Sequence, residues 1–211
     1  MAQNANENEN ESKQHLSGDF EPTWFVSLGI GGQQYYGDHN KQLSFGGRIS
    51  PAVDLSVGRW FTSVVGARLA YNGISVKGAT MNGSHSTGQT PSFNDHPDDG
   101  AQYLTKQKFN YMNLHADLLI NATNLFFGYE EDDTFNLSPY VGLGVAHAFG
   151  TPSTTSLSLN GGFLISFKVS EAVDINVDAH GALVGDKFDG ERGERRGEGV
   201  FGITIGASYR F

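Results

Sequence analysis

Two pairs of titratable residues, His115 with Asp117 and Asp178 with His180, carry the spacing most suited to chemistry. One residue separates the members of each pair, so on a β-strand both side chains would lie on the same face. Two imidazoles and two carboxylates brought together could ligate a metal ion or act as acid–base partners. They could equally form a structural polar network inside a narrow barrel, which side chains fill. We favour the network and expect no catalytic residue, metal or cofactor.

The elements that position these residues are strands. Apolar and polar residues alternate along eight segments, which is the pattern of a strand with one apolar and one polar face. The segments span about 24–36, 42–58, 63–77, 108–121, 138–149, 157–169, 173–184 and 201–211. Eight is the smallest common number of strands in a closed membrane barrel. We predict an all-β fold, an eight-stranded antiparallel up-and-down transmembrane β-barrel over residues 24–211.

The polar strand faces combine glycines with charges of both signs. Small residues are useful where a narrow lumen must hold long side chains, and on a solvated surface they would only weaken the strands. Facing lipid, an Arg or Lys would cost about 2–4 kcal/mol. We therefore place the polar faces inside, although alternation alone leaves open a soluble barrel with an apolar interior. The residues predicted to form the lumen network are Arg48, Asp54, Arg68, His115, Asp117, Lys168, Asp178, His180 and Arg210. Among these, we single out Arg68, Asp117, Lys168 and Arg210 as the residues expected to pair in the network.

The amino-acid composition argues against several classes of function and of binding site. With 14 basic and 23 acidic residues the formal net charge is −9, which argues against a nucleic-acid partner because basic patches supply most of that affinity. The absence of cysteine excludes disulfides and thiolate metal sites. The sequence contains no run of about 18 apolar residues, so we predict no transmembrane helix. Residues 1–23 are polar and acidic without periodicity, and we predict a disordered tail. They lack the features of a signal peptide, so we expect a mature exported chain.

The predicted connections differ in length between the two ends. Those near Trp60 and Glu171 are short, while 78–107 and 185–198 are long. Long outer loops and short periplasmic turns are typical of membrane barrels. We expect a periplasmic aromatic girdle of Trp24, Trp60, Phe61, Phe126, Phe127, Tyr209 and Phe211.

Several motifs, in this order, resemble the small eight-stranded OmpA-type or porin-like outer-membrane barrels. They are 51–68, Asn121–Tyr129, Pro139–Gly144, Ala172–Asn176 and Gly206–Phe211. The resemblance covers residues 24–211 and implies a bacterial outer-membrane location. It also implies a structural, envelope-anchoring or adhesive role, with Tyr209 and Phe211 read by the barrel-assembly machinery. Family members commonly carry a peptidoglycan-binding domain after the barrel. Since this sequence stops at Phe211, we expect either a barrel-only member or an excised barrel.

Other functions remain open at this point. A small porin-like channel is one alternative. A lipid A-modifying enzyme is another, with His85, Ser86 and His147 as its only candidates near the outer rim. The oxygen-rich stretch 94–100 could bind Ca²⁺, and Arg192, Arg195 and Arg196 could contact lipopolysaccharide phosphates, although a solvated loop is the simpler interpretation of each. The partners we expect for a monomeric barrel are outer-membrane lipid and lipopolysaccharide.

Overall fold

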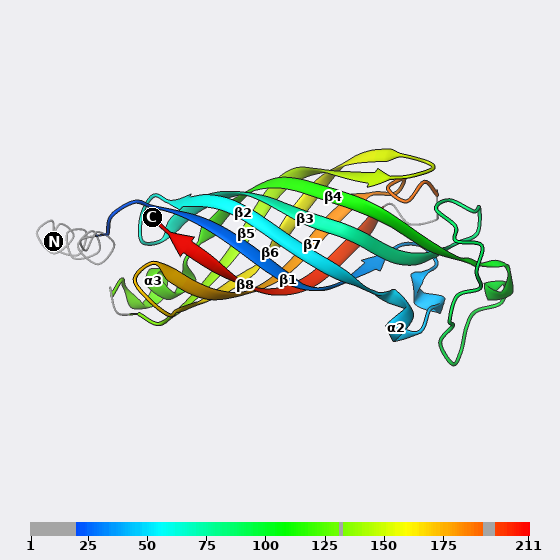
Figure 1. Ribbon diagram of the computed structural model, residues 1–211, viewed down its shortest axis with the longest axis horizontal. Coiled ribbons are helices and arrows are strands. Elements are labelled where there is room, and N and C mark those ends of the chain that lie inside the picture. The colour runs from blue at the N-terminus through cyan, green and yellow to red at the C-terminus, as the bar shows by residue number, and fades with distance from the viewer. Residues whose placement is uncertain (1–19, 131–132, 192–196) are drawn as a thin grey trace, which may run out of the picture.

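The computed structural model describes residues 20–130, 133–191 and 197–211. Within them, eight antiparallel strands form a closed barrel in which each strand pairs with its neighbours in the chain and β8 pairs with β1 (Figure 1). The strands are β1 (Thr23–Tyr36), β2 (Ile49–Trp60), β3 (Val65–Thr80), β4 (Thr105–Ile120), β5 (Phe135–Phe149), β6 (Thr154–Lys168), β7 (Val173–Gly185) and β8 (Gly197–Arg210). The predicted eight-stranded antiparallel barrel is confirmed.

Side chains alternate strictly enough to give the barrel two different surfaces. Outward residues are apolar and exposed, with exposed fractions of 71% for Leu143 and 81% for Leu157. In the middle of the barrel the inward residues are polar and buried, as shown by exposed fractions of 4% for Arg68 and 3% for Asp117. The predicted sidedness, apolar outside and polar inside, therefore holds.

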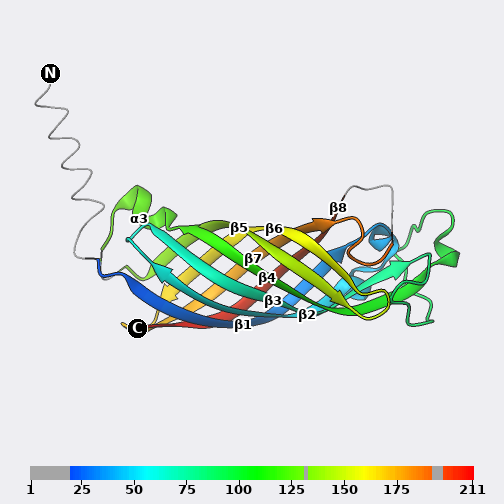
Figure 2. The ribbon, with the colours of Figure 1, turned by 90° about the horizontal axis from the view of Figure 1, so that it is seen from above.

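One end of the barrel, here called the short-turn end, carries compact connections. Residues 61–64 join β2 to β3, and residues 169–172 join β6 to β7. The connection from β4 to β5 contains α3 (Ala122–Phe127), whose first turn is capped by the Asn121 side chain accepting from the Asn124 amide. Figures 1 and 2 place α3 and the C-terminus together at this end.

The opposite end, here called the long-loop end, carries the long connections 37–48 and 81–104 (Figure 2). The first contains η1 (Asn40–Gln42) and α2 (Phe45–Arg48), and the second ends in η2 (Ala101–Tyr103). No helix among the described residues is long and apolar enough to cross a membrane.

The predicted start of the second strand at residue 42 was wrong. The pairing of β2 with β1 ends at Ile49 opposite Gln34, so no partner strand reaches the residues before it. Leu43 instead bridges Phe93 of the long loop and is buried in a small cluster with Ala79 and Leu104. Leu43 thus packs in a loop cluster, and Phe45, the other apolar residue of the predicted strand start, lies in α2 with an exposed fraction of 68%.

The girdle at the short-turn end is mostly as predicted. Its exposed aromatic side chains are Trp24, Phe61, Phe126, Phe127, Tyr209 and Phe211. Arg59 lies over the rings of Trp24 and Phe61, with its guanidinium carbon 5.5 and 6.0 Å from the ring centres. Trp60 is the exception, because it follows an outward residue and therefore points inward. It packs against the buried cluster of Leu119, Tyr140 and Leu164.

Candidate functional site: the barrel lumen

A buried ion-pair network occupies the middle of the lumen. Arg68 on β3 donates from Nε to Asp117 Oδ2 of β4 at 2.8 Å and from Nη1 to Asp178 Oδ2 of β7 at 2.9 Å. The Arg68 guanidinium thus links β3 to its neighbour β4 and to β7, which is distant in the sequence. We call this group, together with the residues bonded to it, the central network.

Neighbouring side chains complete the central network. His115 Nδ1 contacts Asp117 Oδ1 at 2.7 Å, and the other ring nitrogen contacts Asn72 Oδ1 at 2.6 Å. The Asn72 amide donates to Asp54. On the far side, Tyr140 Oη donates to Asp178 Oδ1 at 2.8 Å, and its ring centre lies 4.1 Å from the Arg68 guanidinium carbon.

A glycine makes room for this network. Gly142 on β5 pairs with Asp117 on β4, and a Cβ added at Gly142 would collide with the Asp117 carboxylate and the Ala116 carbonyl oxygen. Glycine is therefore needed because another group approaches closely.

The geometry of these groups bears on metal binding and acid–base chemistry. Each ring nitrogen of His115 already has a partner, and Arg68 lies between Asp117 and Asp178. His180 lies 3.9 Å from Asp178, by Nδ1 to Oδ1. Among the described residues, no group of three or more histidine, aspartate or glutamate side chains is arranged to hold a metal ion.

The other predicted network members lie elsewhere. Arg210 is at the short-turn end, where it pairs with Asp174 at 3.1 Å and donates to the Ser170 carbonyl. Lys168 and Arg210 line a polar cavity of about 670 Å³ at that end. Arg48 is the last residue of α2 and precedes the strand ladder. The proposed grouping of Lys168 and Arg210 with Arg68 and Asp117 is therefore corrected, because the strand positions separate them along the barrel axis.

A second group of buried side chains lies toward the long-loop end. Four buried aromatic residues pack there, and we call them the aromatic plug: Tyr35, Phe109, Tyr111 and Phe188. Phe188 comes from the β7–β8 connection, and its ring centre lies 5.8 Å from that of Phe109 and 6.0 Å from that of Tyr111. A loop thus places an aromatic side chain inside the barrel end.

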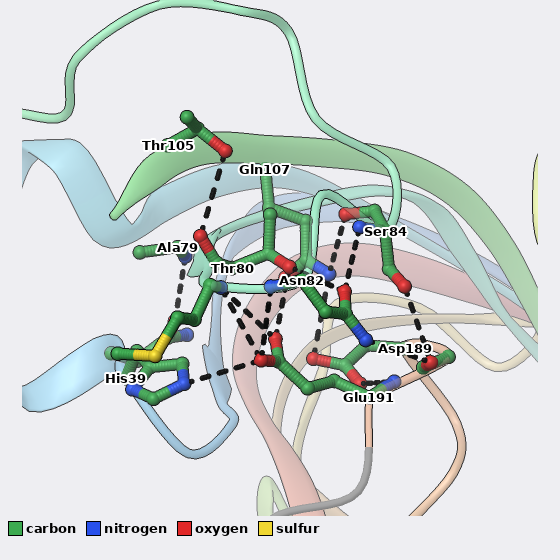
Figure 3. Close-up of polar contacts among 12 residues, drawn as sticks. His39, Ala79, Thr80, Asn82, Ser84, Thr105, Gln107, Asp189 and Glu191 are labelled. Atoms are coloured by element: carbon green, nitrogen blue, oxygen red, sulfur yellow. Dashed lines mark hydrogen bonds and ion pairs between the residues drawn. The ribbon is translucent and has the colours of Figure 1, made fainter. Parts of the chain in front are cut away.

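Two carboxylates anchor that loop (Figure 3). Glu191 accepts from Thr80 Oγ1 at 2.9 Å and from the Met81 and Asn82 amides at 3.3 Å, and it pairs with His39 at 3.4 Å. It therefore ties the β7–β8 connection to both other long connections.

Asp189, which is buried, is the second carboxylate that anchors the β7–β8 connection. It accepts from Gln107 Nε2 at 3.4 Å and from the Glu191 amide at 2.9 Å. Burial raises the pKa of Asp189 above its usual range. Sequence reasoning missed both carboxylates because they sit in a stretch that looked like mobile surface charge. The one available signal was Phe188, an aromatic residue inside a charged loop.

The His39–Glu191 pair shifts both partners. The hydrogen bond to Glu191 raises the pKa of His39 above its usual value, against the effect of burial. Burial alone would raise the pKa of Glu191, but hydrogen bonds from His39 and Thr80 bring it below its usual value. Both shifts favour the charged pair.

The three residues considered as candidates for a lipid A-modifying enzyme contact aromatic and hydroxyl side chains. The ring of His85 stacks on Phe109 with ring centres 4.5 Å apart, and Ser86 Oγ donates to Thr105 Oγ1. His147 contacts the hydroxyls of Thr155 at 2.8 Å and Ser153 at 3.4 Å. Among the described residues neither histidine bonds to a carboxylate.

Of the two candidate binding sites in the loops, the structure describes the oxygen-rich stretch 94–100 but not the three arginines. In the oxygen-rich stretch, Asp98 accepts from Gln42 and Asn94 donates to the Lys41 carbonyl, so these groups join the two long loops. Arg192, Arg195 and Arg196 lie outside the described residues, as does most of the predicted tail.

Two relatives of this chain are outer-membrane proteins. No family model matches the chain. Outer membrane protein 40 of Porphyromonas gingivalis is 23% identical over 202 residues, covering 89% of this chain and 46% of that protein. Outer membrane protein 41 of the same organism is 28% identical over 166 residues, covering 75% and 37%. The chain is an outer-membrane β-barrel. It spans less than half the length of these two relatives.

A solved structure has the same fold. The outer-membrane protein OprG from Pseudomonas aeruginosa matches this outer-membrane barrel with a TM-score of 0.55 and 10% identity, covering 93% of this chain and 99% of that one. The predicted location in a bacterial outer membrane is confirmed by the relatives.

Proposed function

We propose that this outer-membrane barrel is a non-conducting, non-enzymatic anchor that displays its long loops at the cell surface, in an OmpA-type arrangement. The observation that carries the proposal is that buried side chains occupy the lumen at two levels, which we interpret as a double closure. Arg68 and its carboxylate partners fill the middle, and the aromatic plug fills the long-loop end. A small porin-like channel would need a continuous water path past both layers.

The long-loop end supports a surface role. Its connections are tied to one another through Glu191, and Asp98 joins residues 37–48 to residues 81–104. A partner would therefore meet an ordered surface, which lowers the entropic cost of binding.

The relatives support the OmpA-type arrangement. More than half of each lies outside the region matched by this chain. In such proteins the barrel would hold the remaining sequence at the membrane. An anchoring role needs a stable scaffold and no transport path, which is what the buried network supplies.

Site-specific labelling tests the exposed surface. Because the chain has no cysteine, single-cysteine variants report one position each. We expect a membrane-impermeant maleimide to label Thr90→Cys, in the long loop, on intact cells. The matched variant Glu171→Cys, in a short turn, should react only after the cells are opened. The reverse pattern would place the long loops in the periplasm and contradict the surface role.

Lipid analysis tests the enzymatic alternative. A non-enzymatic barrel leaves lipid A acylation unchanged when it is expressed. A new or missing acyl chain that depends on His147 or His85 would refute the anchor proposal in favour of a rim enzyme.

A further inference from the structure

Two lysines face each other directly across two strands near the long-loop end. Lys77 on β3 is the cross-strand partner of Lys108 on β4. Their chain neighbours Val76 and Phe109 are buried in the lumen cluster, so both lysines project to the outside. Lys106 lies two residues from Lys108 and shares its face. We call Lys77, Lys106 and Lys108 the lysine patch.

The lysine patch has no protein counter-charge among the described residues. None of its three ammonium groups forms a hydrogen bond or an ion pair there. Like charges placed directly opposite each other destabilise a strand pair. An anion bound between them would remove that repulsion.

The patch also lies at a defined height on the barrel. Outward residues on β4 are apolar from Ile120 to Met112, with Leu114 48% exposed, and then turn polar at Asn110. Lys108 is twelve positions from Ile120, and at about 3.3 Å per residue with a tilt of about 40° this is a rise of about 30 Å. The rise slightly exceeds the height of the apolar band, about 25 Å, of an outer-membrane barrel. The lysine patch therefore stands at the level of the lipid headgroups.

The local backbone keeps the patch in place. Strand β5 pairs with β4 only as far as Asn110, which leaves the edge of β4 beyond it free. Residues of the long loop cover that edge: the Lys108 amide donates to the His85 carbonyl at 3.2 Å, and the Lys106 amide donates to the Gln89 carbonyl at 2.7 Å. Two of the three lysines thus sit on backbone that is hydrogen-bonded on both sides.

We propose that the lysine patch binds the phosphate groups of a phosphorylated glycolipid headgroup in the outer leaflet. The inference rests on the proposed orientation, which puts the long-loop end outside. Three ammonium groups on one outward face match a dianionic headgroup that approaches from the plane of the membrane. An acidic protein partner would need to reach the same height through the lipid headgroups, which favours the lipid.

Native mass spectrometry of the refolded protein in micelles tests this site. The probes are bisphosphorylated lipid A, the same lipid A with its phosphates removed, and inorganic phosphate. The test variant carries Lys77→Gln and Lys108→Gln. The matched control carries Lys41→Gln and Lys187→Gln, which removes the same charge from exposed loop positions at the same end.

We expect the parent and the control to retain phosphorylated lipid A and to discriminate against the dephosphorylated form. A lysine near an anionic lipid surface contributes about fivefold in affinity, so the test variant should bind about 25-fold more weakly. Equal binding of both lipid A forms, equal losses in test and control variants, or equally tight binding of inorganic phosphate would overturn the assignment.

The result is separable from the proposed orientation, because binding in micelles does not depend on which end faces outward. Retention of phosphorylated lipid A with inverted cysteine labelling would refute the orientation and, with it, the outer-leaflet headgroup. Correct labelling with no phosphate dependence would refute the lysine patch alone.

Discussion

Arg68 offers the sharpest test of the central network. It is the only lysine or arginine that is buried among the described residues, and it pairs with Asp117 and Asp178 at once. Arg68→Met keeps most of the side-chain volume but removes the guanidinium. Because breaking one buried pair costs about 3–5 kcal/mol, losing both should lower the free energy of unfolding by about 5 kcal/mol.

Comparison among variants separates charge from packing. Asp117→Asn leaves Arg68 paired with Asp178, so we expect the lower end of that range, about 3 kcal/mol. The triple change Arg68→Met, Asp117→Asn and Asp178→Asn removes the stranded charges together and should recover most of the loss, because uncharged replacements of buried ion pairs are often close to neutral.

Urea unfolding in lipid vesicles measures these differences. Tryptophan fluorescence follows the transition, and a boiling-dependent shift on gels shows that each variant still forms a barrel. If Arg68→Met were as stable as the parent, or if it lost less stability than Asp117→Asn, the reasoning from paired buried charges would be refuted.

Three further predictions concern packing and pH. Gly142→Ala should destabilise the barrel by about 1–3 kcal/mol, measured by urea unfolding, because the new methyl group meets the Asp117 carboxylate; unchanged stability would contradict the close approach. Phe188→Ala should cost about 3–5 kcal/mol, and hydrogen exchange in the β7–β8 connection should speed up while the strands stay protected; uniform exchange changes would argue against a separate plug. The His39–Glu191 tether should depend on pH: the contribution of Glu191 is present above its ordinary pKa of 4.5 and is lost as pH falls through its lowered pKa, while that of His39 is complete below 6.5 and is lost as pH rises through its raised pKa. Protection factors of the amides bonded to Glu191, in which the intrinsic pH dependence of amide exchange is divided out, should thus be highest between these limits, and His39→Gln should remove their fall at higher pH; protection factors that do not change with pH in the parent would count against the pair.

The fold could be predicted from the sequence because alternate residues of a barrel strand face the lumen and the outside, and these two environments select polar and apolar residues. The inward placement of Arg68, Asp117 and Asp178 follows from that alternation alone. Alternation does not predict which of these side chains contact each other, because contact depends on the register between the strands. Lys168 and Arg210 share the predicted face with Arg68 but lie at the short-turn end.

The errors have a common physical origin. Leu43 and Phe45 alternate with polar residues, yet no partner strand extends to them, so they fold into a loop cluster and a short helix. Trp60 was placed by its nearness to the strand end, and its alternation with Arg59 turns it inward. Glu191 gave no periodic signal, because loop residues gain their partners from segments far away in the chain.

Current through a planar bilayer tests the double closure most directly. The parent barrel should show no stable open level in symmetric salt, and Phe188→Ala should remain closed because the central network still fills the lumen. Only a variant that combines Phe188→Ala with small replacements at Arg68 and Tyr140 should conduct, once a gel shift shows that it is folded. A steady, reproducible open current through the parent protein would contradict the closed lumen and favour a small channel.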